Sequence, residues 1–485
     1  MSRRRFPTPH VMGDGIALAL RRRHVSHQPN VPGKGITASY GPRFWGLAVA
    51  TGVAAGLGAA LLTLILYLVE DRSWSYRSGS FLSAVTRGGA GRHLIVLFAA
   101  GVIAAIAGIL IRRVPGSGAG EISDGLWLGS GRLAFWRSQA RGVLSIVIVG
   151  MGASLGREAA PQLTGAAVAS RLSEWAKVPA WQRRLLVASG AGAGMAAIYN
   201  VPLGGALFAV EVLLGTLTLP VVVPALAVCA IATAVAWIVV PIAPTYAVPA
   251  FGVTASQIVW AAVIGPIAGL VAVAWVRTIA RVNMLKPRRW GRVLAPIVVF
   301  TVLGAVSVAY PQLLGNGKDV VQRAFENHLG VALLAVLLVL KPLATAACLG
   351  TGAPGGLLTP TLTLGVLFGA LLGHGWGEIW PGAAPGSYAV IGGAAVLAAS
   401  MQGPLAAVVL VLEFTGHAGG LIVPVLLAVA EATIVARLFR APSIYSARLT
   451  VEHGKEPPAA LGPLEPEAPG HQRAGPDPVA GAETP

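Results

Sequence analysis

Glu158 is the residue whose type and surroundings are best suited to chemistry on a small anion. It follows Arg157 in the glycine-rich segment 150–161, where two charges interrupt small and apolar residues. Ionisable groups in such a setting are costly and tend to be functional. If this segment starts a helix, the Glu158 carboxylate can occupy the position that a free anion would use, and protonation would release it. The segment therefore predicts a gate for anions.

Two other segments have the same glycine-rich character. Residues 115–120 include Ser117, whose hydroxyl could donate to an anion, and residues 350–360 lie in the second half of the chain. Small residues let the backbone approach a ligand, and a helix that starts there directs its unpaired N–H groups at that ligand. Broken segments at corresponding places in two halves indicate a transport site at a repeat interface.

The elements that must position these segments are membrane helices. The chain has 485 residues, of which 55% are hydrophobic and 11% are charged, and its mean hydropathy is +0.71. Apolar stretches recur from residue 44 to residue 438, and several are too short or too interrupted by Gly and Pro to cross a bilayer alone. Such breaks are tolerated where protein or a water-filled cavity satisfies the backbone. We expect an all-α polytopic membrane protein with one membrane domain.

The placement of charge predicts orientation and domain limits. Residues 1–43 are basic and contain a single acid, Asp14, which is a positive-inside signature for a cytoplasmic N-terminal arm. Residues 44–450 are expected to form the transmembrane domain, with approximate halves at 44–215 and 219–450, although no strong residue-level repeat is evident. Residues 451–485 are Pro-rich and are predicted to be a disordered tail. The net charge of +17 is explained by membrane topology, so we expect no nucleic-acid binding.

The sequence lacks residues that other classes of function would require. Cys229 and Cys348 both lie in apolar runs without metal-ligand spacing, so no metal site and no cofactor are expected. An intramembrane hydrolase would need a nucleophile together with a base or metal set. No His-Glu-x-x-His motif occurs, and the one Gly-x-Ser-x-Gly match, at residues 152–156, lies inside the glycine-rich segment that carries Glu158. We therefore expect no enzyme. A carrier of cations or metabolites is the less favoured alternative, because it would need further buried acids along its path.

Five motifs resemble those of the CLC chloride channels and chloride/proton exchangers. Gly116-Ser117-Gly118 is similar to the start of the family's GSGIP segment, Gly156-Arg157-Glu158 to GREGP, and Gly356-Leu357-Leu358-Thr359-Pro360 to GxFxP. Residues 200–208 resemble the N-x-P-L-x-G-x-L-F stretch, and residues 442–445 resemble the segment that supplies a pore tyrosine. The motifs follow the family's order from about residue 40 to residue 450.

The resemblance implies an inverted repeat of about eighteen tilted and broken helices, in a homodimer with one pore per subunit in the cell membrane. It implies that Glu158 is the external gate and that chloride is the transported ion. The anion-binding residues would be Ser117, Gly118, Arg157, Leu357, Leu358 and Tyr445. Exchangers of this family generally place a second, internal glutamate where this chain has Val212. Because valine cannot pass a proton, we expect channel-like or weakly proton-coupled transport, with a chloride/proton antiporter as the alternative.

Overall fold

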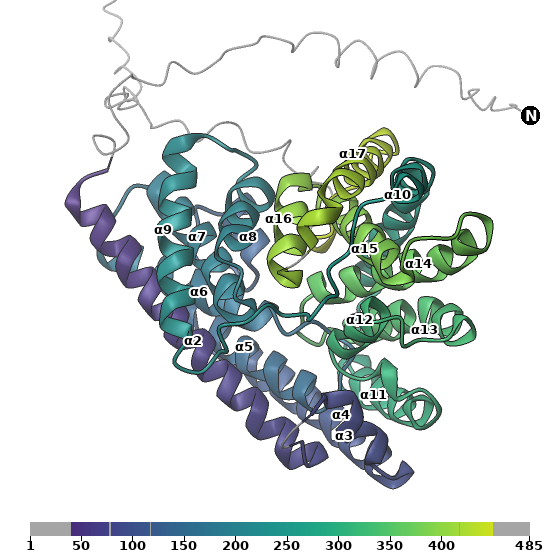
Figure 1. Ribbon diagram of the computed structural model, residues 1–485. Helices are drawn as coiled ribbons and strands as arrows, with labels where there is room; N and C mark the ends of the chain where they lie inside the picture. Colours follow the sequence, from purple (N-terminus) through teal and green to yellow (C-terminus); the bar gives the residue numbers. More distant parts are fainter. Residues whose placement is uncertain (1–39, 77–78, 117, 417, 450–485) are drawn as a thin grey trace, which may run out of the picture. The chain divides into compact units, whose positions relative to one another are not determined.

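The computed structural model describes residues 40–76, 79–116, 118–416 and 418–449. The predicted arm and tail therefore lie almost entirely outside the described residues. The described residues form sixteen α-helices and five short π or 3-10 helices, where the resemblance implied about eighteen helices (Figure 1). The α-helices are α2 Pro42–Trp74, α3 Phe81–Arg87, α4 Ala90–Arg113, α5 Phe135–Gly150, α6 Ala159–Trp175, α7 Ala180–Tyr199, α8 Pro202–Leu207, α9 Leu219–Ala236, α10 Ala255–Met284, α11 Gly291–Ala309, α12 Lys318–Phe325, α13 Val331–Gly350, α14 Leu358–Ile379, α15 Pro385–Met401, α16 Pro404–Thr415 and α17 Ile422–Leu438.

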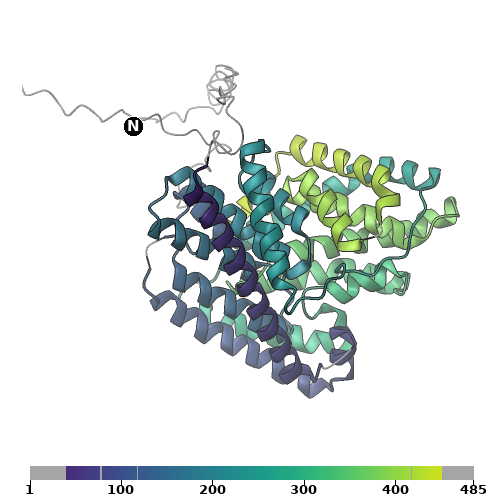
Figure 2. The ribbon, with the colours of Figure 1, turned by 60° about the vertical axis from the view of Figure 1, so that its left-hand side comes forward.

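Eight helices of the described residues are long and apolar enough to cross a membrane, so the chain is a multi-pass membrane protein. The longest is α2, which runs diagonally across α6, α7 and α9 (Figure 2). In contrast, α7 and α15 are buried along most of their length inside the bundle. Their Gly and Ala residues allow this: a Cβ on Gly190 would overlap the carbonyl oxygen of Gly165 on α6. Close helix approach at small residues is typical of membrane bundles.

The two halves repeat each other at residue level around α8 and α16, which the sequence alone did not reveal. Asn200 and Gln402 end the preceding helices in the left-handed conformation, at φ 57° and 58°, and Pro202 and Pro404 begin the next ones. The Glu413 carboxylate accepts the backbone N–H groups of Leu203 and Gly204 at the start of α8.

Glu211, the equivalent acid in the first half, makes the same kind of contact with the second half. The Glu211 carboxylate accepts the N–H groups of Leu405 and Ala406 at the start of α16, at 3.2 and 2.5 Å. Each half thus caps a helix of the other half, and the negative charges lie at the positive ends of the helix dipoles. These two contacts give Glu413 and Glu211 a structural role, as caps of α8 and α16.

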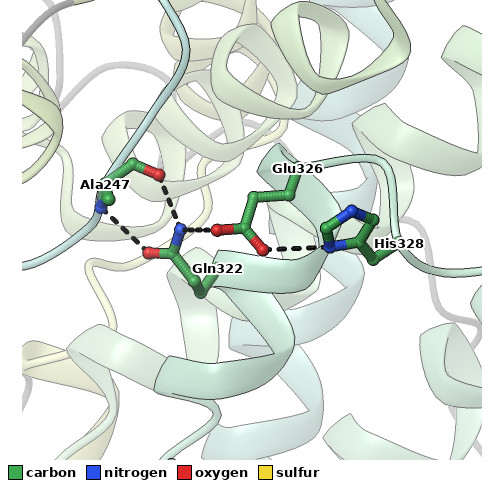
Figure 3. Close-up of polar contacts among 4 residues, drawn as sticks. All are labelled: Ala247, Gln322, Glu326 and His328. Atoms are coloured by element: carbon green, nitrogen blue, oxygen red, sulfur yellow. Dashed lines mark hydrogen bonds and ion pairs between the residues drawn. The ribbon is translucent and has the colours of Figure 1, made fainter.

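The segment between α9 and α10 is anchored to α12. Figure 3 shows the anchor: Gln322 accepts the Ala247 N–H at 2.9 Å and donates to the Ala247 carbonyl at 2.6 Å. Glu326 accepts a hydrogen bond from Gln322 at 2.6 Å and contacts His328 at 3.1 Å (Figure 3). This anchor fixes the connection beside α12, whose first residue, Lys318, faces the site described next.

Candidate functional site

The Glu158 side chain connects the N-termini of two helices from different halves. Glu158 is the N-cap residue of α6, and its carboxylate reaches the start of α14. Oε1 accepts the backbone N–H of Leu358 at 2.7 Å, while Oε2 accepts the hydroxyls of Tyr199 and Thr359 at 3.1 Å each. The residue is 1% exposed. A buried carboxylate that accepts three hydrogen bonds in this arrangement is in the position of a bound anion.

Two glycines bring the helix ends together. Gly156 and Gly356 exchange two backbone hydrogen bonds, each of 2.8 Å, just before α6 and α14. A Cβ atom on either glycine would overlap the carboxylate group of Glu158. Only glycine at both positions therefore leaves room for the carboxylate in its observed place, and the two positive helix ends face it from both halves.

Arg157 and Tyr199 form the wall on one side of the carboxylate. The guanidinium group of Arg157 lies 5.0 Å from the centre of the Tyr199 ring, a cation–π contact. The Tyr199 hydroxyl also lies 2.7 Å from the hydroxyl of Thr359. Arg157 therefore supports the ring whose hydroxyl holds Glu158.

The other predicted site residues are placed as follows. Ser117 lies outside the described residues, and Gly118 adopts a φ of +120° beside Leu133. Leu357 is the buried N-cap residue of α14. The ring of Tyr445 is half-buried and lies 5.2 Å from that of Phe208.

Val212 is buried on the short π-helix Phe208–Leu213, with 8% of its surface exposed. A Cβ on Gly403 would overlap its side chain, so α16 packs closely against it. No charged group replaces the missing glutamate at this position, because the neighbouring Glu211 is bound to the start of α16.

The two sequence neighbours of Glu158 line two different cavities. The first, of about 420 Å³, includes Arg157, Glu70, Lys318 and Asp319 in its lining, and we call it the Lys318 cavity. The second, of about 60 Å³, is lined by Ala159, Ala160, Gln162, Tyr445 and other residues, and we call it the Tyr445 cavity. Since Arg157 lines one and Ala159 the other, Glu158 lies at the barrier between them.

Lys341 holds part of the Lys318 cavity wall in place. This lysine of α13 is 1% exposed, and its ammonium donates to the carbonyls of Leu313 and Gly315 at 2.8 Å each. A buried charge is tolerated when it is fully hydrogen-bonded in this way. Lys341 is therefore explained by the loop it fixes and needs no role on the path.

Tyr199 and Thr359 are the functional candidates that sequence reasoning missed. Thr359 belongs to the motif at residues 356–360 and Tyr199 directly precedes the motif at residues 200–208, but neither residue type is unusual in an apolar helix. The signal that could have found them is a hydroxyl in each half, adjacent to a helix start. Only the folded chain brings both within hydrogen-bonding distance of one carboxylate.

A cluster of charges borders the Tyr445 cavity. The Glu121 carboxylate contacts Arg141 and lies 3.9 Å from Arg448. Burial tends to raise the pKa of this carboxyl, but the charges of Arg141, Arg448 and Lys286 outweigh it and lower the pKa below its ordinary value of 4.5. Ionised Glu121 therefore stabilises the fold above about pH 4.5, and this stability is lost as the pH falls through the lowered pKa.

Replacing this carboxylate tests the cluster. We expect Glu121→Gln to lower the free energy of unfolding by about 1 kcal/mol at pH 7, because the group is partly exposed. The difference from the unmodified protein should shrink as the pH falls toward 3. Thermal unfolding in detergent at both pH values measures it, with Glu174→Gln, which removes the looser ion pair to Arg132, as control. A deficit that is equal at both pH values would contradict the assignment.

Known proteins resemble this chain in sequence and fold. Residues 100–437 match the family described as voltage gated chloride channel. A putative chloride channel protein, ClcB-like, of Ralstonia nicotianae is 32% identical over 70% of this chain and 81% of its own. The voltage-gated ClC-type chloride channel ClcB of Citrobacter koseri is 30% identical over 67% of this chain and 78% of its own.

Solved structures share the fold at lower identity. A slow cyanobacterial Cl⁻/H⁺ antiporter superposes with a TM-score of 0.74 at 21% identity, over 84% of this chain and 97% of that one. A CLC-type fluoride/proton antiporter gives a TM-score of 0.68 at 19% identity, over the same shares. At this identity the likeness concerns the arrangement of helices, which agrees with the predicted all-helical inverted repeat.

Proposed function

The chain belongs to the voltage-gated chloride channel family, and we propose that it carries chloride through a path closed by the Glu158 carboxylate. Family membership makes it an anion channel or transporter and not an enzyme, as expected. The observation that supports the gate is the carboxylate between the starts of α6 and α14. A chloride ion that took its place would meet the same Leu358 N–H and the same two hydroxyls.

We propose passive or weakly proton-coupled conduction, because Val212, which cannot accept a proton, stands where exchangers of this family generally have the internal glutamate. Glu211 is not a substitute, since one residue along a helix is a rotation of about 100° and its carboxylate is bound to α16. The buried contact of Val212 with the Gly403 region also argues against a water channel at this point. A chloride/proton antiporter is the alternative.

Flux measurements separate these proposals. Liposomes with the purified protein are expected to release chloride faster than empty liposomes, and a lack of difference would contradict anion transport. The reversal potential under opposed chloride and pH gradients then identifies the mode. We expect it to follow the chloride gradient alone, whereas a constant contribution from pH would support the antiporter.

Removing the Tyr199 hydroxyl is expected to loosen the gate. Tyr199→Phe keeps the ring beside Arg157 and deletes one hydrogen bond to the Glu158 carboxylate. A hydrogen bond to a charged group is worth about 1.5–3 kcal/mol, so the ratio of open to closed states should rise roughly tenfold or more. Chloride efflux from liposomes measures this change. Tyr388→Phe, which removes a hydroxyl bound to Ser256, is the control and should leave the flux unchanged.

Arginines at the end of the bundle where α2 and α7 start support an orientation of the protein in the membrane. Tyr40 lies beside Trp181, 5.7 Å between ring centres, so α2 starts next to the start of α7. That end of the bundle holds Arg183 and Arg184, bound to the loop before α5. By the positive-inside rule we propose that it faces the cytoplasm of the cell membrane, as does the N-terminal arm, and that residues 44–450 form the transport domain.

We also propose a homodimer with one pore in each subunit. The gate is complete within one chain, because Glu158, Tyr199 and Thr359 all belong to it. Light scattering of the purified protein in detergent should give twice the mass of one chain. A monomer that conducts chloride would contradict the dimer and leave the pore proposal intact.

A further inference from the structure

A strongly basic surface lies where α4 ends and α11 begins. The two helices pack side by side and antiparallel, with Gly101 against Pro296 and Gly304 against His93 (Figure 1). This arrangement brings together exposed cations from the last turn of α4 and from the segment that leads into α11. We define them as the basic cluster: Arg112, Arg113, Arg288, Arg289 and Arg292.

The cluster has an excess of positive charge that no ion pair among the described residues neutralises. The stretch 281–292 contains five cations and no acid: Arg281, Lys286, Arg288, Arg289 and Arg292. The antiparallel packing of α4 and α11, with Gly101 against Pro296, brings the end of α4 to the same side as the start of α11. Among the described residues, the ion pairs of arginine to carboxylate involve Arg132, Arg141 and Arg448 instead. An external anion would therefore stabilise the cluster.

An apolar groove begins on the same helix. A cavity of about 290 Å³ lies between α11 and α13, and its lining contains only apolar side chains, among them Val298, Val302, Leu340 and Ala347. Val298 follows Arg292 by six residues, which is about 9 Å along a helix. The groove therefore continues from the cluster along the face of α11, where Val298 and Val302 are each 55% exposed.

Trp290 lies among the arginines of the basic cluster, between Arg289 and Arg292 in the sequence. It is 80% exposed, and tryptophan is typical of the level where lipid headgroups meet the hydrocarbon core. Basic pockets between membrane helices bind the headgroups of anionic lipids. We propose that one anionic phospholipid binds here, with its phosphate at Arg112, Arg288 and Arg292 and one acyl chain in the groove between α11 and α13.

A phospholipid fits both the basic cluster and the apolar groove, whereas a free phosphate ion fits the basic cluster alone. Phosphate alone would use the arginines and leave the groove unaffected. Topology alone would explain cations on this side but not their alignment with an apolar groove on the same helix. The inference does not depend on the gate, because none of these residues touches Glu158.

Thermal unfolding of the full chain in detergent tests the site. We expect phosphatidylglycerol, compared with phosphatidylcholine, to raise the midpoint by roughly 3 °C, since a ligand that binds only the folded state stabilises it. The variant R112Q/R288Q/R292Q should lose this shift. The control R171Q/K177Q/R440Q removes three exposed cations elsewhere and should keep it.

A second variant tests the groove without touching the charges. Val302→Trp fills the groove, so it should reduce the phosphatidylglycerol shift while the basic cluster remains intact. Equal shifts in the cluster variant and the control would overturn the proposal. So would an equal shift from inorganic phosphate at the same concentration, because it would assign the cluster to a free anion.

Discussion

Glu158→Gln is expected to increase chloride flux. The amide has nearly the same size as the carboxylate but no negative charge, so it holds the starts of α6 and α14 more weakly and does not compete with chloride. The Leu358 N–H would lose a charge-assisted hydrogen bond of about 1.5–3 kcal/mol. This corresponds to a change of at least about tenfold in the closed population.

The matched control is Glu174→Gln, which removes a carboxylate that pairs with Arg132 on the surface, away from the two cavities. Its flux should equal that of the unmodified protein. Flux is measured as chloride efflux from liposomes. A Glu158→Gln protein that keeps the unmodified flux would contradict the gate.

Gly356→Ala is expected to open the path while leaving Glu158 in place. The new methyl group would occupy the space of the carboxylate, and the atoms that it meets all belong to the end of the Glu158 side chain. Such a flexible group can turn away, so the helices need not move. We expect chloride flux close to that of Glu158→Gln, and Gly156→Ala should act in the same way from the other half.

Two variants make this result specific. Gly350→Ala adds a methyl group near Val282 at the end of α13, away from the carboxylate, and should leave the flux unchanged. In a Glu158→Ala background, Gly356→Ala should have no further effect, because the group that it displaces is absent. Additive effects of the two substitutions would mean that Gly356 acts through the backbone and would contradict steric release of the gate.

The sequence was sufficient for the class of fold and for the central contact. Composition and broken apolar stretches predicted a multi-pass helical bundle, and the likeness to solved structures confirms the family's fold. The motif around Glu158 and the second-half segment around Leu358 were predicted to meet, and they do, through one hydrogen bond of 2.7 Å. Glycine, proline and a lone charge carry such information because their backbone and solvation needs are local.

Contacts between ordinary residues could not be predicted in this way. Tyr199 and Thr359 become gate residues only because α7 and α14 meet at Glu158. The reciprocal caps by Glu211 and Glu413 depend on the register of the two halves, which hydropathy does not define. Ser117 stays a prediction from the family motif, since it lies outside the described residues.

The central claim is that the Glu158 carboxylate and the transported anion compete for one position. Crystals of Glu158→Gln grown in bromide test it directly through the anomalous signal of the ion. We predict a bromide peak within hydrogen-bonding distance of the Leu358 N–H, between Gly156 and Gly356, and no such peak in the unmodified protein. An empty position in Glu158→Gln, or a peak beside an undisplaced carboxylate, would contradict the account.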